Sequence, residues 1–178
     1  MKIKNKIITI VPVLLAAMAF SFSSCLKEND TYVDFSKVAT TIELPLAALN
    51  QETNVKVVPK TYTASAAGSD LAIVVNIASP KPLSSNLTVT LGVNANALAA
   101  LNTATGGNYI MLPSTGYTAS SLSVTIPAGQ RTGTVNIKIN TAAIDKTQTK
   151  YVLPVSITDA GGEKISMYST VSYNIKVN

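Results

Sequence analysis

The feature that most constrains the fold is a strict alternation of apolar and polar residues. In LAIVVNI, Leu71, Ile73, Val75 and Ile77 fall on one side of the chain. Successive side chains of a β-strand point to opposite faces, so this alternation predicts strands with one dry and one wet face, typical of antiparallel sheets. The same pattern recurs in runs that begin at Leu87, Leu122, Val135, Leu153 and Val171, and less clearly around residues 40–44 and 55–58.

Turn-forming residues separate these runs. Pro80-Lys81-Pro82, Pro127-Ala128-Gly129 and Asp159-Ala160-Gly161-Gly162 each stand between two alternating segments, and such clusters mark turns and hairpin connections. Strands spaced in this way predict an all-β, immunoglobulin-like β-sandwich of about seven to eight strands.

One segment lacks the two-residue period and favours a short helix. Residues 94–104 are rich in Ala and Leu, which are strong helix formers. Asn94 or Asn96 is suited to the N-cap, and Gly106-Gly107 ends the segment in the way that glycine ends helices. We expect this helix to cross from one sheet edge to the other.

The first residues are typical of a secretory signal peptide. Three lysines precede an uncharged run of 14 residues, 7–20, and small residues follow it. Fourteen residues at about 1.5 Å rise cover roughly 21 Å, which is shorter than the bilayer core of about 30 Å. A signal peptide is therefore favoured over a membrane-spanning helix.

Cys25 is the only cysteine of the chain, so it has no disulfide partner within it. The residues Phe22-Ser23-Ser24-Cys25 resemble a bacterial lipobox. That resemblance implies cleavage between Ser24 and Cys25, lipid on Cys25 and attachment to a membrane. We expect residues 1–24 to be the signal, 25–37 a lipidated tether and 38–178 the sandwich domain.

Residues 26–30, LKEND, resemble the export signal that sends Bacteroidetes lipoproteins to the outside of the outer membrane. This resemblance implies an outer-membrane lipoprotein that faces the cell exterior. The alternative is that these charges only solvate a tether, in which case orientation toward the periplasm remains open.

Composition excludes several classes of function. Three of the 14 basic residues precede the expected cleavage site. The segment after it therefore has 11 basic and 9 acidic side chains. Without a Lys/Arg cluster this balance does not favour a nucleic-acid binder. The chain has no histidine, which rules out catalysis by Ser-His or Cys-His pairs. The scattered acids form no motif for a metal, so we expect neither cofactor nor enzymatic activity.

A combination of motifs resembles a known family. Asn102 ends the helical segment, Gly107–Pro113 reads GNYIMLP, Tyr117 follows, and the later segments are VTIPAG at 124–129 and YVLPVSI at 151–157. This order is similar to that of the immunoglobulin-like domain of unknown function near the N-termini of Bacteroidetes surface lipoproteins. In that family the domain often precedes lectin-like or glycosidase modules, which implies a link to glycans by association.

Tyrosines are the candidate contacts for a sugar, because an aromatic ring offers an apolar face with a polar tip. The candidates are Tyr62, Tyr109, Tyr117 and Tyr168. Tyr62 and Tyr168 are expected to be the more exposed, whereas packing over the end of the sandwich is the alternative for Tyr109 and Tyr117. Lys146, Lys150 and Lys164 are interpreted as solvated loop charges.

Two functions remain in competition. The first is a non-enzymatic surface lipoprotein that binds polysaccharide or assists a neighbouring surface lipoprotein in uptake or adhesion. The second is a structural or assembly subunit that uses a free sheet edge, since edge strands readily pair with another chain. Exposed tyrosines beside Asn or Lys would favour the first, and a long, unprotected edge strand would favour the second.

Overall fold

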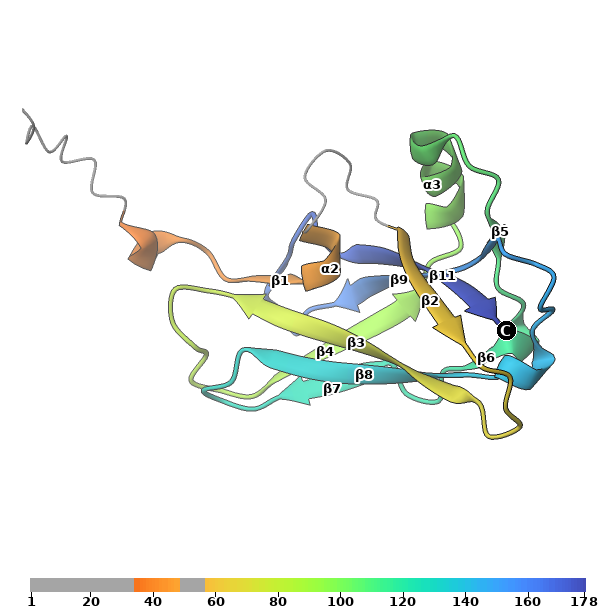
Figure 1. The fold of residues 1–178 in the computed structure, drawn as a ribbon. Helices are drawn as coiled ribbons and strands as arrows, with labels where there is room; N and C mark the ends of the chain where they lie inside the picture. Colours follow the sequence, from red (N-terminus) through yellow and green to blue (C-terminus); the bar gives the residue numbers. More distant parts are fainter. Residues whose placement is uncertain (1–33, 49–56) are drawn as a thin grey trace, which may run out of the picture. The chain divides into compact units, whose positions relative to one another are not determined.

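A computed structural model of the 178-residue chain describes residues 34–48 and 57–178. Residues Phe35–Asn178 form one compact unit, shown in Figure 1. The expected cleavage site and lipid attachment site, Ser24 and Cys25, lie outside the described residues. The unit contains two sheets that form a β-sandwich, as the alternation predicts.

The first sheet has five strands in the order β10-β1-β3-β8-β6. Its central pair, β3 and β8, is antiparallel, with Ser69 opposite Ile139 and Asn76 opposite Thr132. Only β1 and β10 run parallel. The strands are β1 (Thr41–Glu43), β3 (Ser69–Ala78), β6 (Tyr117–Thr118), β8 (Thr132–Ile139) and β10 (Lys164–Ile165).

The second sheet has the order β2-β11-β9-β4-β7. In addition, β5 pairs with the first two residues of β9, Tyr151 and Val152. Parallel pairing joins β2 to β11 and β5 to β9, and the other pairs are antiparallel. The strands are β2 (Val57–Tyr62), β4 (Leu87–Val93), β5 (Ile110–Met111), β7 (Ser123–Ile126), β9 (Tyr151–Asp159) and β11 (Thr170–Val177). Three of the eleven described strands, β5, β6 and β10, have only two residues.

The core lies between the two sheets and follows the sequence alternation. In β3, Leu71, Ile73, Val75 and Ile77 are each at most 1% exposed, and the residues between them face outward. Strands β9 and β11 are instead buried on both faces. Helix α3 (Ala97–Thr105) packs against both strands and is drawn beside them in Figure 1.

The expected helix is present, but its beginning differs from the prediction. Gly106 ends α3 in the left-handed conformation, with φ of 61°. Asn96 occupies the N-cap position without a capping side-chain hydrogen bond, and the Asn94 side chain donates to Ser156 Oγ instead. The helix lies on the second sheet, whose strand β9 supplies that serine.

The prediction of one helix missed a second α-helix of four residues. Helix α2 (Pro45–Ala48) follows β1 and contacts β3 and β11, so it lies between the two sheets. It contributes the fully buried Ala47 to the core. Three 3-10 turns complete the described elements: η1 (Phe35–Lys37), η2 (Ser114–Gly116) and η3 (Thr141–Ala143).

The sandwich has two ends, which the strand directions define. Strands β2, β8 and β11 finish at one end, where β3 and β9 begin; we call it the tyrosine end. At the opposite end β1 begins and β3 finishes, so the chain enters the domain there; we call it the entry end.

Candidate functional site

Three of the four candidate tyrosines gather at the tyrosine end. Tyr62 ends β2 opposite Val177, and Tyr117 in β6 lies opposite Ile139. Tyr109 precedes β5, which pairs with the beginning of β9. Tyr168 precedes β11, and the eight residues of that strand separate it from Tyr62 by about 26 Å. The four tyrosines therefore do not form one site.

Burial differs from the expectation for two of these tyrosines. Tyr62 and Tyr168 are half-buried and pack against the hydrophobic core, as Tyr117 does. Tyr109 is half-buried as well, so burial does not set Tyr62 and Tyr168 apart as the more exposed rings. Burial raises the pKa of Tyr62, and the negative charge of Asp70 raises it further. Burial also raises the pKa of Tyr173, with a smaller contribution from Tyr62.

A side chain of α3 holds Tyr109 in place. The Tyr109 backbone N–H donates to Asn102 Oδ1 at 2.8 Å, and Asn102 Nδ2 donates to the Tyr109 carbonyl oxygen at 3.0 Å. These two hydrogen bonds tie the backbone just before β5 to the last turns of the helix. It explains why Asn102 and Gly107–Tyr109 belong to one motif: the amide group satisfies a backbone donor and acceptor that no strand pairs.

The rest of the motif packs the tyrosine end. Leu112 is 1% exposed, and its backbone N–H donates to the Val152 carbonyl at 2.8 Å. Gly116 lies so close to Leu112 and Ile144 that an added Cβ would come within 3.1 Å and 3.3 Å of their side chains. The motif therefore builds the connection from α3 to β6. Tyr117 packs against the core, whereas Tyr109 is half-buried beside Gly107 and is not among the side chains packed against the core.

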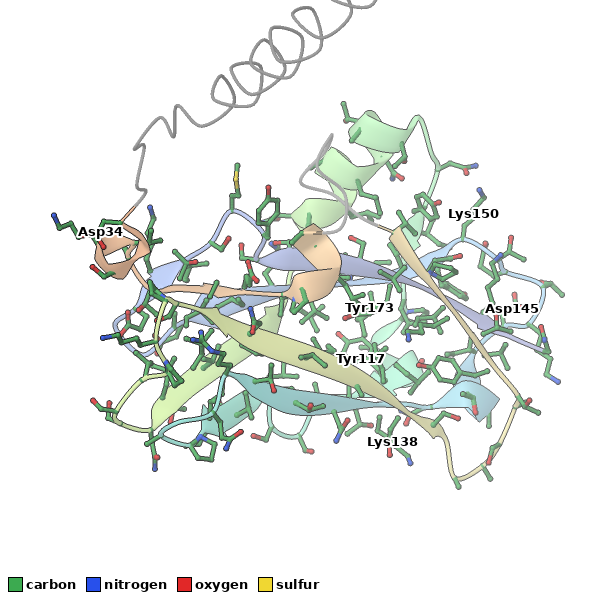
Figure 2. The ribbon with its side chains drawn as sticks, turned by 60° about the vertical axis from the view of Figure 1, so that its left-hand side comes forward. Asp34, Tyr117, Lys138, Asp145, Lys150 and Tyr173 are labelled. Carbon is green, nitrogen blue, oxygen red and sulfur yellow. The ribbon has the colours of Figure 1, made fainter. Side chains whose placement is uncertain are left out.

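Lys150 lies over the ring of Tyr109, with Nζ 5.2 Å from the ring centroid. An ammonium within about 6 Å of an aromatic ring is attracted by the ring's negative face. Lys150 is exposed and precedes β9, and Figure 2 shows it at the same end as Tyr117. The interpretation of Lys150 as only a solvated charge missed this contact, because the two residues are 41 positions apart in sequence.

Four acidic side chains have structural partners. Glu43 accepts a hydrogen bond from Asn76 at 2.8 Å, and Asp70 pairs with Lys138 at 3.3 Å. Asp145 accepts from the backbone N–H and the hydroxyl of Thr147, and these bonds lower its pKa. Asp159 accepts from the Gly161 N–H. In the ranges 34–48 and 57–178, no three or more Asp, Glu, His or Cys residues come together as a metal site.

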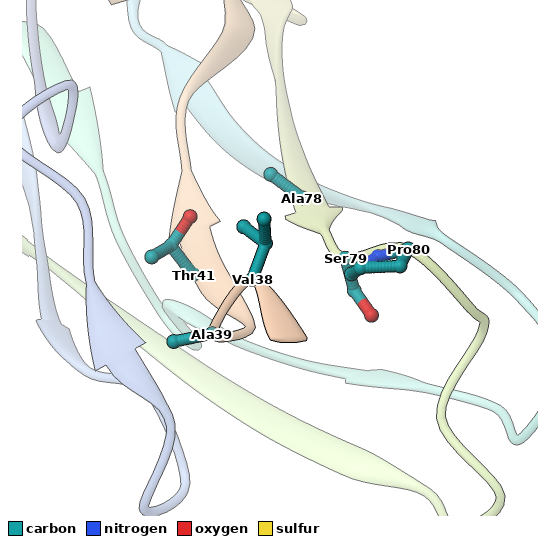
Figure 3. Close-up of a pocket in the computed structure, with 6 residues that line it drawn as sticks. All are labelled: Val38, Ala39, Thr41, Ala78, Ser79 and Pro80. Carbon is teal, nitrogen blue, oxygen red and sulfur yellow. The ribbon is translucent and has the colours of Figure 1, made fainter. Parts of the chain in front are cut away.

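A shallow apolar groove lies at the entry end, which sequence patterns did not indicate. Its volume is about 420 Å³, and Figure 3 shows it between the chain before β1 and the end of β3. The guanidinium of Arg131 donates to the carbonyls of Ser79 and Pro80 and so fixes one wall. The lining residues are Val38, Ala39, Thr41, Ala78, Ser79 and Pro80.

The terminal strands of the two sheets are short or protected, but in the first sheet they cover only part of their neighbours. β6 pairs with β8 only at Lys138 and Ile139, and β1 pairs with β3 only from Asn76 to Ala78. In the first sheet, β10 and β6 have two residues each. In the second sheet, β7 has four residues, and β2 carries Pro59 and Lys60 in its middle. Proline and lysine are devices that discourage pairing with another chain. Residues 132–137 of β8, however, have no paired strand on the side of β6, so an assembly subunit that acts through a strand edge stays an alternative.

The family of the chain follows from its sequence and fold. A family model of an N-terminal domain matches residues 28–164. Because this match covers most of the chain, the protein belongs to that family of N-terminal domains, which are Bacteroidetes domains of unknown function. The resemblance drawn from the GNYIMLP, VTIPAG and YVLPVSI segments is thereby confirmed. No curated protein matches the chain in sequence.

Solved structures from Bacteroides share the fold. A multidomain protein of Bacteroides ovatus that includes DUF1735 is 18% identical with a TM-score of 0.60, over 79% of this chain and 46% of that chain. A proposed carbohydrate-binding protein of Bacteroides ovatus is 16% identical with a TM-score of 0.55, over 76% of this chain and 36% of that chain.

A third structure is Bacteroides thetaiotamicron EndoBT-3987 with a Man5GlcNAc product. It is 20% identical with a TM-score of 0.53, over 76% of this chain and 30% of that chain. The chain spans less than half the length of each of these three structures. In the described residues, no helix is both long and apolar enough to cross a bilayer.

Proposed function

We propose that this protein is a non-enzymatic, glycan-binding accessory module of the cell envelope, anchored by lipid on Cys25. The observation that carries the proposal is the Tyr109–Lys150 pair, a half-buried aromatic ring with the Nζ of an exposed lysine 5.2 Å from its centroid. Rings supply an apolar face for a sugar, and a polar neighbour fixes its orientation. Similar Bacteroides structures support a link to carbohydrate.

A catalytic role has weaker support than a binding role. A glycosidase needs two carboxyl groups that face each other across the bond to be cleaved. Glu43, Asp70, Asp145 and Asp159 each bind a structural partner instead. The activity of a longer relative, such as EndoBT-3987, therefore gives no reason to assign a reaction to this domain.

Retention of full-length protein on immobilised polysaccharides tests the binding role. The panel contains neutral and acidic polymers, and the protein is purified in a mild detergent. Tyr109→Ala should weaken retention by roughly threefold to tenfold, the value of an aromatic contact of about 0.5–1.5 kcal/mol. Tyr168→Ala is the matched control at the opposite end. Equal loss in both variants, or no retention on any polymer, would refute the proposal.

The lipid anchor needs a separate test. A single acyl chain binds a membrane only marginally, whereas several chains hold a protein stably. We expect mass spectrometry of protein extracted from membranes to find an N-terminus at Cys25 that carries acyl chains. Cys25→Ser should release the protein from the membrane fraction. Protease treatment of intact cells should cleave an outward-facing domain, and complete resistance would contradict the proposed surface location.

A further inference from the structure

Strand β8 has an edge that the rest of the domain leaves unpaired. On one side, β3 pairs with β8 over its whole length, from Thr132 to Ile139. On the other side, β6 pairs only with Lys138 and Ile139. After β6 the chain leaves the first sheet and forms β7 of the second sheet, which Figure 1 shows beside β8. Residues 132–137 therefore lack a neighbouring strand on this side, and we call them the open edge.

The hydrogen bonds at the two ends of β8 show which backbone groups the open edge presents. Just before β8, the Arg131 carbonyl accepts from the Ile77 N–H at 2.7 Å. Just after β8, the Asn140 N–H donates to the Gly116 carbonyl, beside β6, at 2.9 Å. Successive residues of an antiparallel strand direct their backbone groups to opposite sides, so the odd-numbered residues of β8 bond to β3. The N–H and C=O groups that point to the open edge belong to Thr132, Thr134 and Asn136.

These backbone groups are accessible and have no internal partner. Within residues 34–48 and 57–178, no backbone or side-chain group forms a hydrogen bond with them. The side chains of Thr132, Thr134 and Asn136 are exposed. Gly133 has no side chain and is still only half-buried, so backbone itself reaches the solvent here. Unpaired N–H and C=O groups along a strand are a template for pairing with another chain.

The open edge lacks the devices that discourage pairing elsewhere in the sandwich. Residues 69–75 of β3 also lack a strand on the side of β1, but they carry the charged Asp70, and α2 contacts β3. Strand β2 carries Pro59 and Lys60, and β6, β7 and β10 are short. Residues 132–137, TGTVNI, contain neither proline nor a charged side chain. The uncharged segment therefore presents its backbone without protection.

From this arrangement we infer that the open edge pairs with the open edge of a second copy of the chain, antiparallel about a two-fold axis at Thr134. In this register Thr134 lies opposite Thr134 of the second copy, and Thr132 lies opposite Asn136. All three residues direct their backbone groups to the edge, so each outward N–H meets an outward C=O. The edge is thus complementary to itself, as a two-fold interface requires. The two first sheets become one continuous sheet.

Charge and the position of β6 favour this partner and this register. β6 occupies the edge from Lys138 onward, so a second strand fits only beside residues 132–137. Lys138 of one copy lies about 27 Å along the strands from Lys138 of the other, which exceeds the Debye length of about 8 Å. Lys138 is also paired with Asp70 at 3.3 Å. The Arg131 guanidinium is bonded to the carbonyls of Ser79 and Pro80. No like charges therefore oppose each other across the axis.

Cysteine cross-linking of the full-length chain in a mild detergent tests the pairing and its register. A Cys25→Ser background leaves each introduced cysteine as the only one. Thr134→Cys should form a covalent dimer under mild oxidation, because directly opposite Cα atoms are about 5.5 Å apart, within the range of a disulfide. Thr132→Cys or Asn136→Cys alone should cross-link at least about tenfold more slowly, since each lies about 14 Å from its own counterpart. A mixture of these two variants should cross-link.

Sedimentation of the Cys25→Ser chain measures the association without a cross-link. The average mass should rise towards that of two chains as the protein concentration increases from about 10 to about 500 µM. Thr134→Lys sets two ammonium groups opposite each other at the axis and should weaken the association at least about tenfold. Ala72→Lys is the matched control, because Ala72 is exposed on β3 of the same sheet, away from the open edge. This variant should associate as the unsubstituted chain does.

Several results would overturn the inference. One is a Thr134→Cys variant that cross-links no faster than Asn136→Cys, and another is the mass of a single chain at every concentration. Association that survives Thr134→Lys would overturn the assignment to the open edge. Cross-linking of Thr134→Cys to a different protein in cells, without doubling of the mass, would overturn a second copy as the occupant. Circular dichroism shows whether each variant is folded. Glycan binding is tested separately, because Tyr109 and Lys150 lie beside β5 and β9 of the second sheet.

Discussion

The most direct prediction concerns Asn102, whose amide holds the Tyr109 backbone. Asn102→Ala removes the bond from the Tyr109 N–H at 2.8 Å and the bond to the Tyr109 carbonyl at 3.0 Å. Each intramolecular hydrogen bond contributes about 1 kcal/mol net. The loss of both should lower the free energy of unfolding by about 2 kcal/mol, because the alanine leaves the donor and the acceptor of a part-buried peptide without these partners.

Chemical denaturation monitored by circular dichroism measures this change in the free energy of unfolding, and thermal unfolding gives the corresponding shift in Tm. For a domain of this size, 1 kcal/mol corresponds to a shift of about 2–4 °C in Tm, so a decrease of about 4–8 °C is expected. Asn102→Asp should give an intermediate loss near neutral pH. Its carboxylate still accepts from the Tyr109 N–H, but it cannot donate to the carbonyl.

The control is Asn108→Ala. Asn108 is exposed, and its side chain forms no hydrogen bond in the described part of the chain. Its replacement should change the free energy of unfolding by less than about 0.5 kcal/mol. If Asn102→Ala were as mild as Asn108→Ala, the amide would not hold the loop, and the account of the motif would be wrong. Asn102→Ala should also weaken retention on polysaccharide, because Tyr109 is then less well positioned.

Two further predictions concern burial and pH. Leu101 is fully buried on the sheet-facing side of α3, so Leu101→Ala should cost about 2–5 kcal/mol. Leu98 is half-buried, so Leu98→Ala should lower the free energy of unfolding clearly less. Equal decreases in the two variants would contradict the packing of α3. The raised pKa of Tyr173 means that the unfolded chain loses this proton first as pH rises, so stability should fall above about pH 10. Tyr173→Phe should flatten that decline in alkaline denaturation curves, and an unchanged slope would show that the buried hydroxyl does not titrate differently in the two states.

The sequence by itself determined the longer strands and their dry faces, but not the two-residue strands β5, β6 and β10, which are too short to show an alternation. Leu71, Ile73, Val75 and Ile77 are buried as their alternation predicts, because the side-chain period of a strand is a local property of the backbone. The end of α3 at Gly106 was also predicted from the sequence, because glycine adopts the left-handed conformation without steric cost. Ser24 and Cys25 lie outside the described residues, so the lipid anchor stays a prediction.

Only the tertiary structure decided which strands are covered on both faces and which tyrosines and lysines lie together. Periodicity does not show that a strand is covered on both faces, so the burial of Val152 under the α3 side of the second sheet could not be foreseen. The separation of Tyr62 from Tyr168 depends on the β2–β11 pairing, and the meeting of Tyr109 with Lys150 depends on the β5–β9 pairing. Such pairings join residues far apart in sequence, and they are selected by the packing of the whole core.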